Sequence, residues 1–277
     1  MSSLPAPQYE TAGDLELSFR GHAVRRPLYL APAEAGLFRQ WLEILRSTGV
    51  PYALGGAYAH YGYTNVWRDS KDLDVFMRPD DVRAVLDAFA AVGFDTEVRN
   101  PHWLAKVHRP PHLLDILFAV RHVTRLRITD EWLQTSLAAR FLGVSTRLLG
   151  PEETVATKAY IGNRDRFDGA DILHIIRALQ GELDWPRLVE LLEGDEEILL
   201  WHLILFAFVY PMHRDWLPQA LMERAFERLQ STPALLGARA FRGTVLDPEA
   251  FRVDVAEWGY RDGGSHPPIL DRSGRAL

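Results

Sequence analysis

Apolar and polar positions repeat along this chain with two different periods, one typical of helices and one typical of strands. Residues 33–48 carry apolar side chains at helical spacing and precede Gly49, so a helix that ends at that glycine is predicted. Residues 79–92 predict a second amphipathic helix, which Pro79 opens and Gly93 closes. Short apolar runs between turn residues predict strands at 15–20, 51–54, 72–77, 95–99, 103–108 and 113–120, with a short helix at 57–61.

The period changes in the middle of the chain. Residues 131–139 are predicted to be helical and 141–149 to be extended, and from Pro151 onward the pattern is almost wholly helical. The later helices are predicted at about 151–162, 168–180, 185–193, 196–210 and 215–229. We therefore expect an α+β fold: a small mixed β-sheet core flanked by helices at 15–125, then a helical domain at 126–230. Residues 1–14 and 231–277 are predicted to be extensions, which either wrap around the protein or are partly disordered.

Composition narrows the class of protein without pointing to a partner. The chain has 277 residues, 47% of them hydrophobic, and a formal net charge of -6, so there is no overall attraction to nucleic acid or to an anionic membrane. The absence of cysteine excludes disulfides, thiolate metal sites and cysteine nucleophiles. The most apolar stretch, 198–210, is too short to span a bilayer and is interpreted as a buried core helix. Without a recognisable signal peptide, the protein is expected to be cytoplasmic.

The candidate chemistry begins with two aspartates on one predicted strand. Side chains alternate across a strand, so Asp72 and Asp74 lie on the same face, while Leu73 and Val75 lie on the other. Two neighbouring carboxylates repel each other unless a cation lies between them. Carboxylate oxygens suit Mg²⁺, which proteins often hold with one or two carboxylates together with substrate phosphates. The pair therefore predicts a metal site for Mg²⁺, or for Mn²⁺.

Two further features extend this predicted site. Gly55 and Gly56 lie at a predicted strand-to-helix turn, where backbone N–H groups and the helix N-terminus can receive phosphate. Asp115 lies within an apolar strand, where a charge is costly unless it meets a metal or a cation. Three carboxylates beside a phosphate-binding turn are what two-metal phosphoryl transfer requires. The alternative for Asp115 is a salt bridge on the strand, with Lys106 as the partner.

The sequence around these residues resembles a known superfamily. Gly55-Gly56, then Arg68, then Ser70-Lys71-Asp72-Leu73-Asp74 is similar to the first motif of the DNA polymerase β-like nucleotidyltransferases. The stretch from Pro151 through Lys158 and Arg164 to Asp168 and Asp171 resembles the helical motif of the AbiEii-like bacterial members. The resemblance covers roughly residues 35 to 180.

The resemblance implies a role for each matching residue. Asp72 and Asp74 would bind the metal, with Asp115 in the position of the third carboxylate, and these three would form the catalytic set. The nucleoside triphosphate would be bound by Gly55, Gly56, Arg68, Ser70, Lys71 and Lys158, with Arg68 either bracing its loop or contacting phosphate. The implied activity moves a nucleoside monophosphate from an NTP, such as ATP, to an acceptor hydroxyl or phosphate and releases pyrophosphate. The acceptor is either a small molecule or an RNA or protein.

Several of these residues also have a structural interpretation. Lys158 could be an ordinary surface lysine, and Arg164, Arg166, Asp168 and Asp171 are better explained as an ion-pair cluster between helices. His102, His108 and His112 follow no familiar zinc-ligand spacing and are expected at the surface or at the rim of the site. Tyr58, Tyr61 and Tyr63 are expected in the core or in a pocket wall, and the run from Trp201 to Phe208 in the core.

Two other functions compete with catalytic nucleotidyl transfer. The first is a catalytically inactive nucleotidyltransferase-like module that binds only a nucleotide or a partner. Loss of a carboxylate or of the glycine pair would favour it, and the chain keeps both. The second takes the two aspartates as the metal clamp of a nucleotide-sugar glycosyltransferase. Only 71 residues precede Asp72, too few for the nucleotide-binding α/β half that such enzymes place before that motif.

Overall fold

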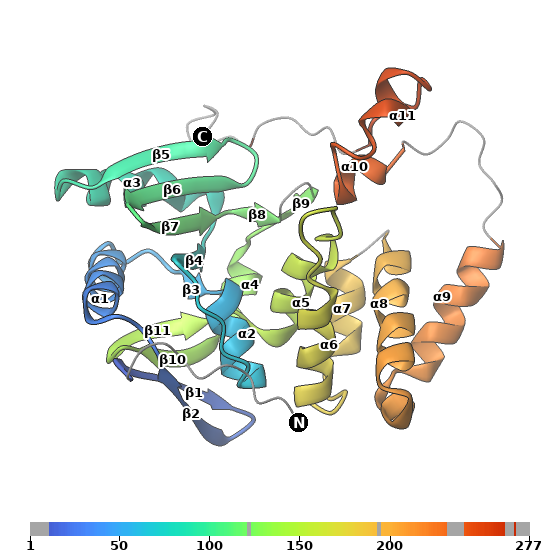
Figure 1. The fold of residues 1–277 in the computed structure, drawn as a ribbon, viewed down its shortest axis with the longest axis horizontal. Helices are drawn as coiled ribbons and strands as arrows, with labels where there is room; N and C mark the ends of the chain where they lie inside the picture. Colours follow the sequence, from blue (N-terminus) through green and yellow to red (C-terminus); the bar gives the residue numbers. More distant parts are fainter. Residues whose placement is uncertain (1–10, 121–122, 193–194, 232–240, 264–268, 270–277) are drawn as a thin grey trace. The chain divides into compact units, whose positions relative to one another are not determined.

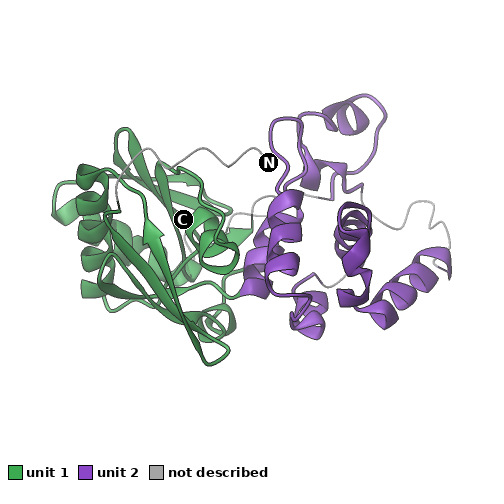
Figure 2. Ribbon diagram, turned by 60° about the horizontal axis from the view of Figure 1, so that its bottom comes forward, with its two compact units in different colours: residues 1–120, 127–150, 268–277 green, residues 121–126, 151–267 purple. Residues whose placement is uncertain are grey.

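The computed structural model describes residues 11–120, 123–192, 195–231, 241–263 and 269. The chain divides into two compact units, coloured separately in Figure 2. Unit 1 comprises residues 1–120, 127–150 and 268–277, and unit 2 comprises residues 121–126 and 151–267. Within the described residues, no helix is both long enough and apolar enough to cross a membrane.

Unit 1 is built on a mixed sheet whose strand order is β2-β1-β10-β11-β3-β4-β7-β6-β5 (Figure 1). The strands are β1 (Gly13–Phe19), β2 (His22–Leu28), β3 (Ala53–Leu54), β4 (Asp72–Phe76), β5 (Asp95–Asn100), β6 (Leu104–Arg109), β7 (His112–Leu117), β10 (Leu137–Phe141) and β11 (Val144–Leu148). The pairs β4–β7 and β11–β3 are parallel, and the other pairs are antiparallel. The helices are α1 (Pro32–Ser47), α2 (Gly56–Thr64), α3 (Pro79–Ala91) and α4 (Asp130–Gln134).

The helices of unit 1 form where their apolar faces meet this sheet. In α1, Phe38, Trp41 and Leu45 recur at helical spacing and are fully buried. In α3, Val85 and Phe89 are buried in the same way. Helix α3 packs against β5 and β6, whereas α2 packs against β1, β2 and β4. The contact between α2 and β4 places the N-terminus of α2 beside that strand.

Unit 2 is helical in the residues that the structure describes. Its helices are α5 (Pro151–Ala159), α6 (Gly169–Ala178), α7 (Trp185–Leu191), α8 (Glu196–Val209), a 3-10 helix (Pro211–Trp216), α9 (Gln219–Ser231), α10 (Gly243–Leu246) and α11 (Arg252–Ala256). Two short strands, β8 (Ala119–Val120) and β9 (Val123–Arg127), lie at the sequence boundary between the units. The α+β class with a following helical region is confirmed, and the sheet is larger than predicted.

The prediction of a helix over 131–139 was wrong after residue 134, whereas the predicted extended segment 141–149 contains β11. The helix stops at Gln134, where the hydroxyl of Thr135 donates to the carbonyl of Glu131, an alternative to further helical hydrogen bonding. A two-residue hairpin then joins β10 to β11 through Leu142 and Gly143, both with positive φ, a geometry that suits a tight antiparallel turn. These two strands join β1 to β3 and so enlarge the sheet.

Three other predictions need smaller corrections. Strand β2 was not predicted, although the positive φ of Arg20 and Gly21 makes the hairpin turn that precedes it. The predicted strand 113–120 is divided at Phe118. The predicted helix 215–229 begins only at Gln219, after a 3-10 helix. Residues 1–10 and most of 264–277 lie outside the described residues, while 241–263 of the predicted C-terminal extension contain α10 and α11.

The prediction for the apolar helix α8 was also wrong in part. Leu203 and Phe206 are buried, but Trp201, Ile204 and Phe208 are exposed, Phe208 to 82%. The helix is apolar on all sides, yet its packing partners α5, α6 and α9 leave one side uncovered. The run from Trp201 to Phe208 is therefore only half core.

Candidate active site

Three aspartates gather on one face of the sheet in unit 1. Asp72 and Asp74 lie on the same side of β4, and Asp115 on β7 pairs in parallel register with Asp74. Residues directly opposite each other on neighbouring strands point to the same face, and such strands lie about 4.8 Å apart. The structure therefore brings together the carboxylates that the sequence placed on two separate strands.

The buried side chains on the opposite face of β4 and β7 fix the register of these two strands. Leu73 and Val75 on β4 and Leu114 and Ile116 on β7 are all fully buried. A slip of one residue would bury the aspartates and expose these four side chains, so the apolar pattern specifies which way the carboxylates point.

The two predicted glycines lie against this carboxylate face. The N–H of Gly55 donates to the carbonyl of Asp74 at 3.0 Å, and α2 starts at Gly56. Gly56 has a φ of 54°, and a Cβ there would lie 1.7 Å from Oδ2 of Asp74. A Cβ at Gly55 would lie 2.1 Å from the ring of Phe76. Only glycine lets the N-terminus of α2 approach Asp74 so closely, and that terminus carries a partial positive charge.

The charge of the Asp72 carboxylate is unfavourable in its surroundings. Burial raises its pKa above the ordinary value, and the charge of Asp115 raises it further, against the opposing effects of Lys106, His112 and Lys71. Within the described residues, its carboxylate makes no hydrogen bond or ion pair. Such a group gains from a cation in its vicinity.

Asp115 has a cation already. Nζ of Lys106 lies 2.7 Å from Oδ1 and 3.0 Å from Oδ2 of Asp115, and both side chains are 16% exposed. The structure thus shows the ion pair that was the alternative interpretation of Asp115, and it also places this carboxylate beside Asp74.

The loop that leads into β4 is held by its own side chains. The indole N–H of Trp67 donates to Asp69 at 2.8 Å, and its ring meets the rings of Tyr29 and Tyr61 edge-on. The hydroxyl of Ser70 donates to the carbonyl of Asp72 at 3.0 Å. Arg68 and Lys71, predicted to bind the nucleotide, are exposed on this loop. The role of Trp67 in holding the loop was not predicted, because one of its ring partners, Tyr29, lies far away in the sequence.

Tyr58 provides a further polar group near the carboxylates. Its side chain is 1% exposed, yet its hydroxyl has no hydrogen-bond partner within the described residues. Burial raises the pKa of Tyr58 well above its ordinary value, and Glu34 and Asp74 raise it further, so the hydroxyl stays a donor. Tyr61 and Tyr63 are buried as predicted, and their hydroxyls donate to the carbonyls of Pro27 and Leu149.

These observations fit a divalent cation with oxygen ligands. Asp72 offers a carboxylate that makes no hydrogen bond or ion pair with the described residues, and Asp74 stands beside it on the same strand face. The close approach of Gly56 leaves N–H groups of a helix start next to that pair, as a phosphate group would require. The residues present therefore fit Mg²⁺ or Mn²⁺ together with a bound phosphate.

The three histidines considered for zinc are separated in unit 1. Nε2 of His108 lies 3.2 Å from Glu97, and Nδ1 of His112 lies 3.3 Å from the carbonyl of Lys71 and 3.7 Å from Glu34. His102 lies in the turn before β6 and is half-buried. His112 thus ties β7 to the start of α1 and to the loop before Asp72, which fits its predicted place at the rim of the site.

Lys158 lies in unit 2 and is not a surface lysine. It is 5% exposed on α5, and its Nζ lies 2.8 Å from a carboxylate oxygen of Asp168 and 2.8 Å from one of Asp171. Arg166 pairs with Asp168 as well, at 2.7 Å. Of the ion-pair cluster expected for Arg164, Arg166, Asp168 and Asp171, the last three are confirmed, with Lys158 as the centre. The backbone N–H of Arg164 donates instead to Asp247 at 3.1 Å. The contact of Lys158 with a triphosphate stays a prediction.

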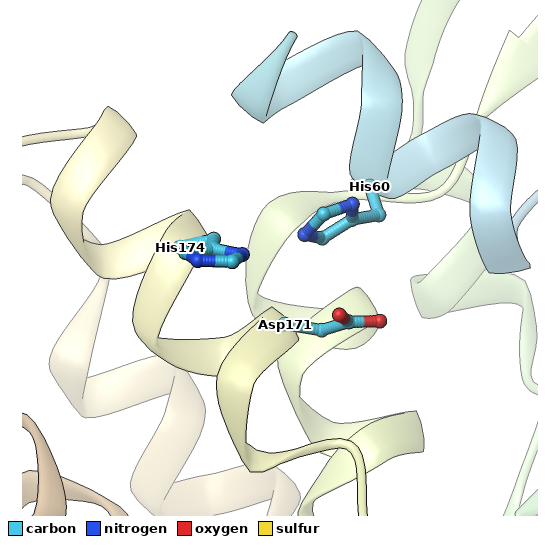
Figure 3. A group of neighbouring side chains, drawn as sticks. All are labelled: His60, Asp171 and His174. Atoms are coloured by element: carbon cyan, nitrogen blue, oxygen red, sulfur yellow. The ribbon is translucent and has the colours of Figure 1, made fainter. Parts of the chain in front are cut away.

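Figure 3 shows Asp171 and two histidines that the sequence did not single out, His60 and His174. His60 lies on α2 of unit 1, where its Nδ1 is 3.4 Å from the hydroxyl of Thr64. Asp171 and His174 lie one turn apart on α6 of unit 2. Asp171 belongs to the Lys158 cluster described above.

We expect Lys158→Met to lower the free energy of unfolding by about 3–5 kcal/mol, because it leaves two buried carboxylates without their shared cation. Burial by itself would raise the pKa of Asp168, but Arg166 and Lys158 outweigh it and hold the pKa below the ordinary value. This part of the stability is therefore present above the pKa of an unfolded aspartate and is lost as the pH falls through the lower pKa of the folded state.

Urea denaturation of both proteins across that pH range measures the effect. The exposed Lys71→Met is the matched control and should change the unfolding free energy by no more than about 0.5 kcal/mol. A loss of less than about 1 kcal/mol in Lys158→Met would contradict the structural importance of the cluster.

Comparison with known proteins gives only distant likenesses. No protein-family model matches the sequence, and no curated protein matches it. Solved structures that share part of the arrangement include the antibiotic-resistance factor ANT(2'')-Ia, at 14% identity and a TM-score of 0.43, covering 73% of this chain and 97% of that one. The lincosamide antibiotic adenylyltransferase LnuA has 16% identity and a TM-score of 0.39, with coverages of 53% and 96%.

A third similar structure is an antigenic nucleotidyltransferase-like protein from Paracoccidioides brasiliensis, with 17% identity and a TM-score of 0.37, covering 61% of this chain and 91% of that one. These TM-scores and identities are too low for the likeness itself to support a conclusion about what this chain does.

Proposed function

We propose that this chain is a nucleotidyltransferase that depends on a divalent metal and moves a nucleoside monophosphate from an NTP to an acceptor hydroxyl or phosphate. One observation carries the proposal: Asp72, Asp74 and Asp115 share one sheet face, and the glycine start of α2 lies directly against Asp74. The resemblance of this same segment to the DNA polymerase β-like superfamily supports it. We also propose that the chain belongs to the AbiEii-like branch of that superfamily.

The reaction joins an acceptor oxygen to the α-phosphorus and breaks the bond from that phosphorus to the β-phosphate oxygen, so pyrophosphate leaves. A divalent ion, when bound, neutralises phosphate charge and orients the leaving group. Asp72 and Asp74 would hold that ion, because they are the carboxylates next to the phosphate-binding turn. The N–H groups at Gly55 and Gly56 and the exposed side chains of Arg68 and Lys71 would bind the triphosphate.

Ser70 has a supporting role in this proposal. Its hydroxyl donates to the carbonyl of Asp72, and the N–H of Asp72 donates back to that hydroxyl at 3.3 Å. The residue therefore holds the entry to β4 and fixes where the first carboxylate stands. The buried hydroxyl of Tyr58, which has no hydrogen-bond partner among the residues that the structure describes, would donate a hydrogen bond toward the carboxylate group or an oxygen bound there.

The test is pyrophosphate release by the full chain with Mg²⁺, each of the labelled NTPs and a panel of acceptors that spans small hydroxylated molecules, RNA and proteins. We expect one NTP to release pyrophosphate in step with labelling of an acceptor, and EDTA to stop both. No release with any NTP and acceptor from folded protein would contradict the proposal. Calorimetry distinguishes the inactive module, which would bind NTP equally well in Asp72→Asn and in the wild type.

A further inference from the structure

A row of four charged side chains crosses four strands of unit 1 on the carboxylate face. Asp74 on β4 pairs with Asp115 on β7, Asp115 pairs with Lys106 on β6, and Lys106 pairs with Glu97 on β5. Directly opposed residues share a face, so the row holds three carboxylates and one ammonium. Lys106 stands between two acids and could neutralise either.

The structure assigns Lys106 to Asp115. Its Nζ contacts both carboxylate oxygens of Asp115, at 2.7 and 3.0 Å. Glu97 is instead engaged by Nε2 of His108 at 3.2 Å. Within the described part of the chain, Asp115 is the partner of Lys106, and the two side chains are equally shielded, at 16% exposure.

The bidentate contact limits what else Asp115 can bind. Mg²⁺ and Mn²⁺ bind carboxylate oxygens at about 2.0–2.2 Å, and a cation at Asp115 would then stand within a few ångströms of Nζ. At such separations two cations repel by several kcal/mol even in a well-screened protein environment. Asp72, by contrast, has no cation within hydrogen-bond distance in the described residues. The ammonium of Lys106 therefore neutralises Asp115, whereas the described residues place no cation in contact with Asp72.

We propose that Lys106 takes the place of a second metal ion at Asp115, so that the site holds one divalent ion, between Asp72 and Asp74. This inference rests on the proposed function and refines it, because three free carboxylates would hold two ions. Lys106 is a positioning residue: it acts through Asp115, whose carboxylate it turns toward β6 and keeps from coordinating metal.

A purely structural ion pair is the competing explanation. Cross-strand charge pairs stabilise a sheet by only about 0.2–1 kcal/mol, and such a role predicts no change in metal stoichiometry when the lysine is removed. Counting bound metal ions therefore separates the two explanations in a way that a stability measurement does not.

The experiment is a Mn²⁺ titration of the full chain with an equimolar non-hydrolysable NTP analogue, followed by electron paramagnetic resonance. We expect one Mn²⁺ per chain in the wild type and two, magnetically coupled, in Lys106→Met, whose Asp115 is free. Lys106→Arg should bind one ion, as the wild type does, because the guanidinium can donate to both carboxylate oxygens of Asp115. The double variant Lys106→Met/Asp115→Asn should also return to one. Glu97→Gln is the matched control and should keep one ion, because the pair between Lys106 and Asp115 is intact.

Two ions in the wild type, or one ion in folded Lys106→Met, would overturn the inference and leave the proposed function standing. No Mn²⁺ in the wild type would contradict the proposed function itself. If Lys106→Met does not fold, Lys106→Gln replaces it, and the wild-type count still decides between one ion and two. Circular dichroism of each variant establishes that the counts come from folded protein.

Discussion

Asp72→Asn is expected to reduce pyrophosphate release by about 1,000-fold or more while leaving the chain at least as stable as the wild type. The substitution keeps the shape of the side chain and removes one of the two carboxylates proposed to hold the metal. A metal ion contributes several kcal/mol to stabilising transition-state charge, and each 1.4 kcal/mol is about a factor of ten in rate. Pyrophosphate release at saturating Mg²⁺ and NTP measures the loss.

The expected stability of Asp72→Asn follows from the electrostatics of the metal-free site. Burial and the charge of Asp115 raise the pKa of Asp72 above its unfolded value. A carboxyl group with a raised folded pKa contributes its stability at low pH, and that contribution is lost as the pH rises through the folded pKa. At neutral pH, the uncharged asparagine is therefore expected to stabilise the chain in EDTA relative to the ionised aspartate.

Thermal unfolding in EDTA at about pH 3, below the ordinary pKa of an aspartate, and at about pH 7.5 provides the measurement. A variant that is inactive and also clearly less stable at pH 7.5 would show that Asp72 supports the fold, and the activity loss could then not be assigned to metal binding. An active Asp72→Asn would remove Asp72 from the proposed metal ligands.

Gly56→Ala is expected to reduce activity by about 100-fold or more, through the position of Asp74. The added Cβ would lie 1.7 Å from Oδ2 of Asp74, so the carboxylate or the start of α2 must move by more than an ångström. Displacements of about 1 Å in an active site can cost about 100-fold in rate. The positive φ of Gly56 adds a backbone cost of about 1 kcal/mol for any other residue.

The chain offers a matched control for the backbone cost. Gly49 has a φ of 70°, but a Cβ there would meet nothing within 4 Å. Gly49→Ala should therefore lose a similar amount of stability to backbone strain and keep full pyrophosphate release. Equal activity in Gly56→Ala and Gly49→Ala would contradict the proposal that the start of α2 must approach Asp74 this closely. Urea denaturation of both variants shows that the backbone costs are comparable.

Local rules account for the parts of the fold that were predicted correctly. The helical spacing of Phe38, Trp41 and Leu45 and the proline at the start of α3 depend only on nearby residues, and both helices appear where expected. The failures occur where distant segments decide the outcome. Residues 137–141 form a strand because β1 and β11 supply their hydrogen-bond partners. The sequence of the segment itself does not indicate those partners.

The candidate site divides in the same way. The sequence alone determined that Asp72 and Asp74 share a strand face, because alternation is a property of one extended segment, and it placed two glycines at the turn before α2. Only the tertiary structure decided that Asp115 stands in register with Asp74, because strand pairing joins residues about 40 positions apart. Lys106 was foreseen as a partner of Asp115, but its grip on both oxygens depends on the antiparallel register of β6 and β7. Helix packing likewise decided that Lys158 is buried between Asp168 and Asp171. The sequence of its own helix does not show whether the lysine meets a carboxylate or water.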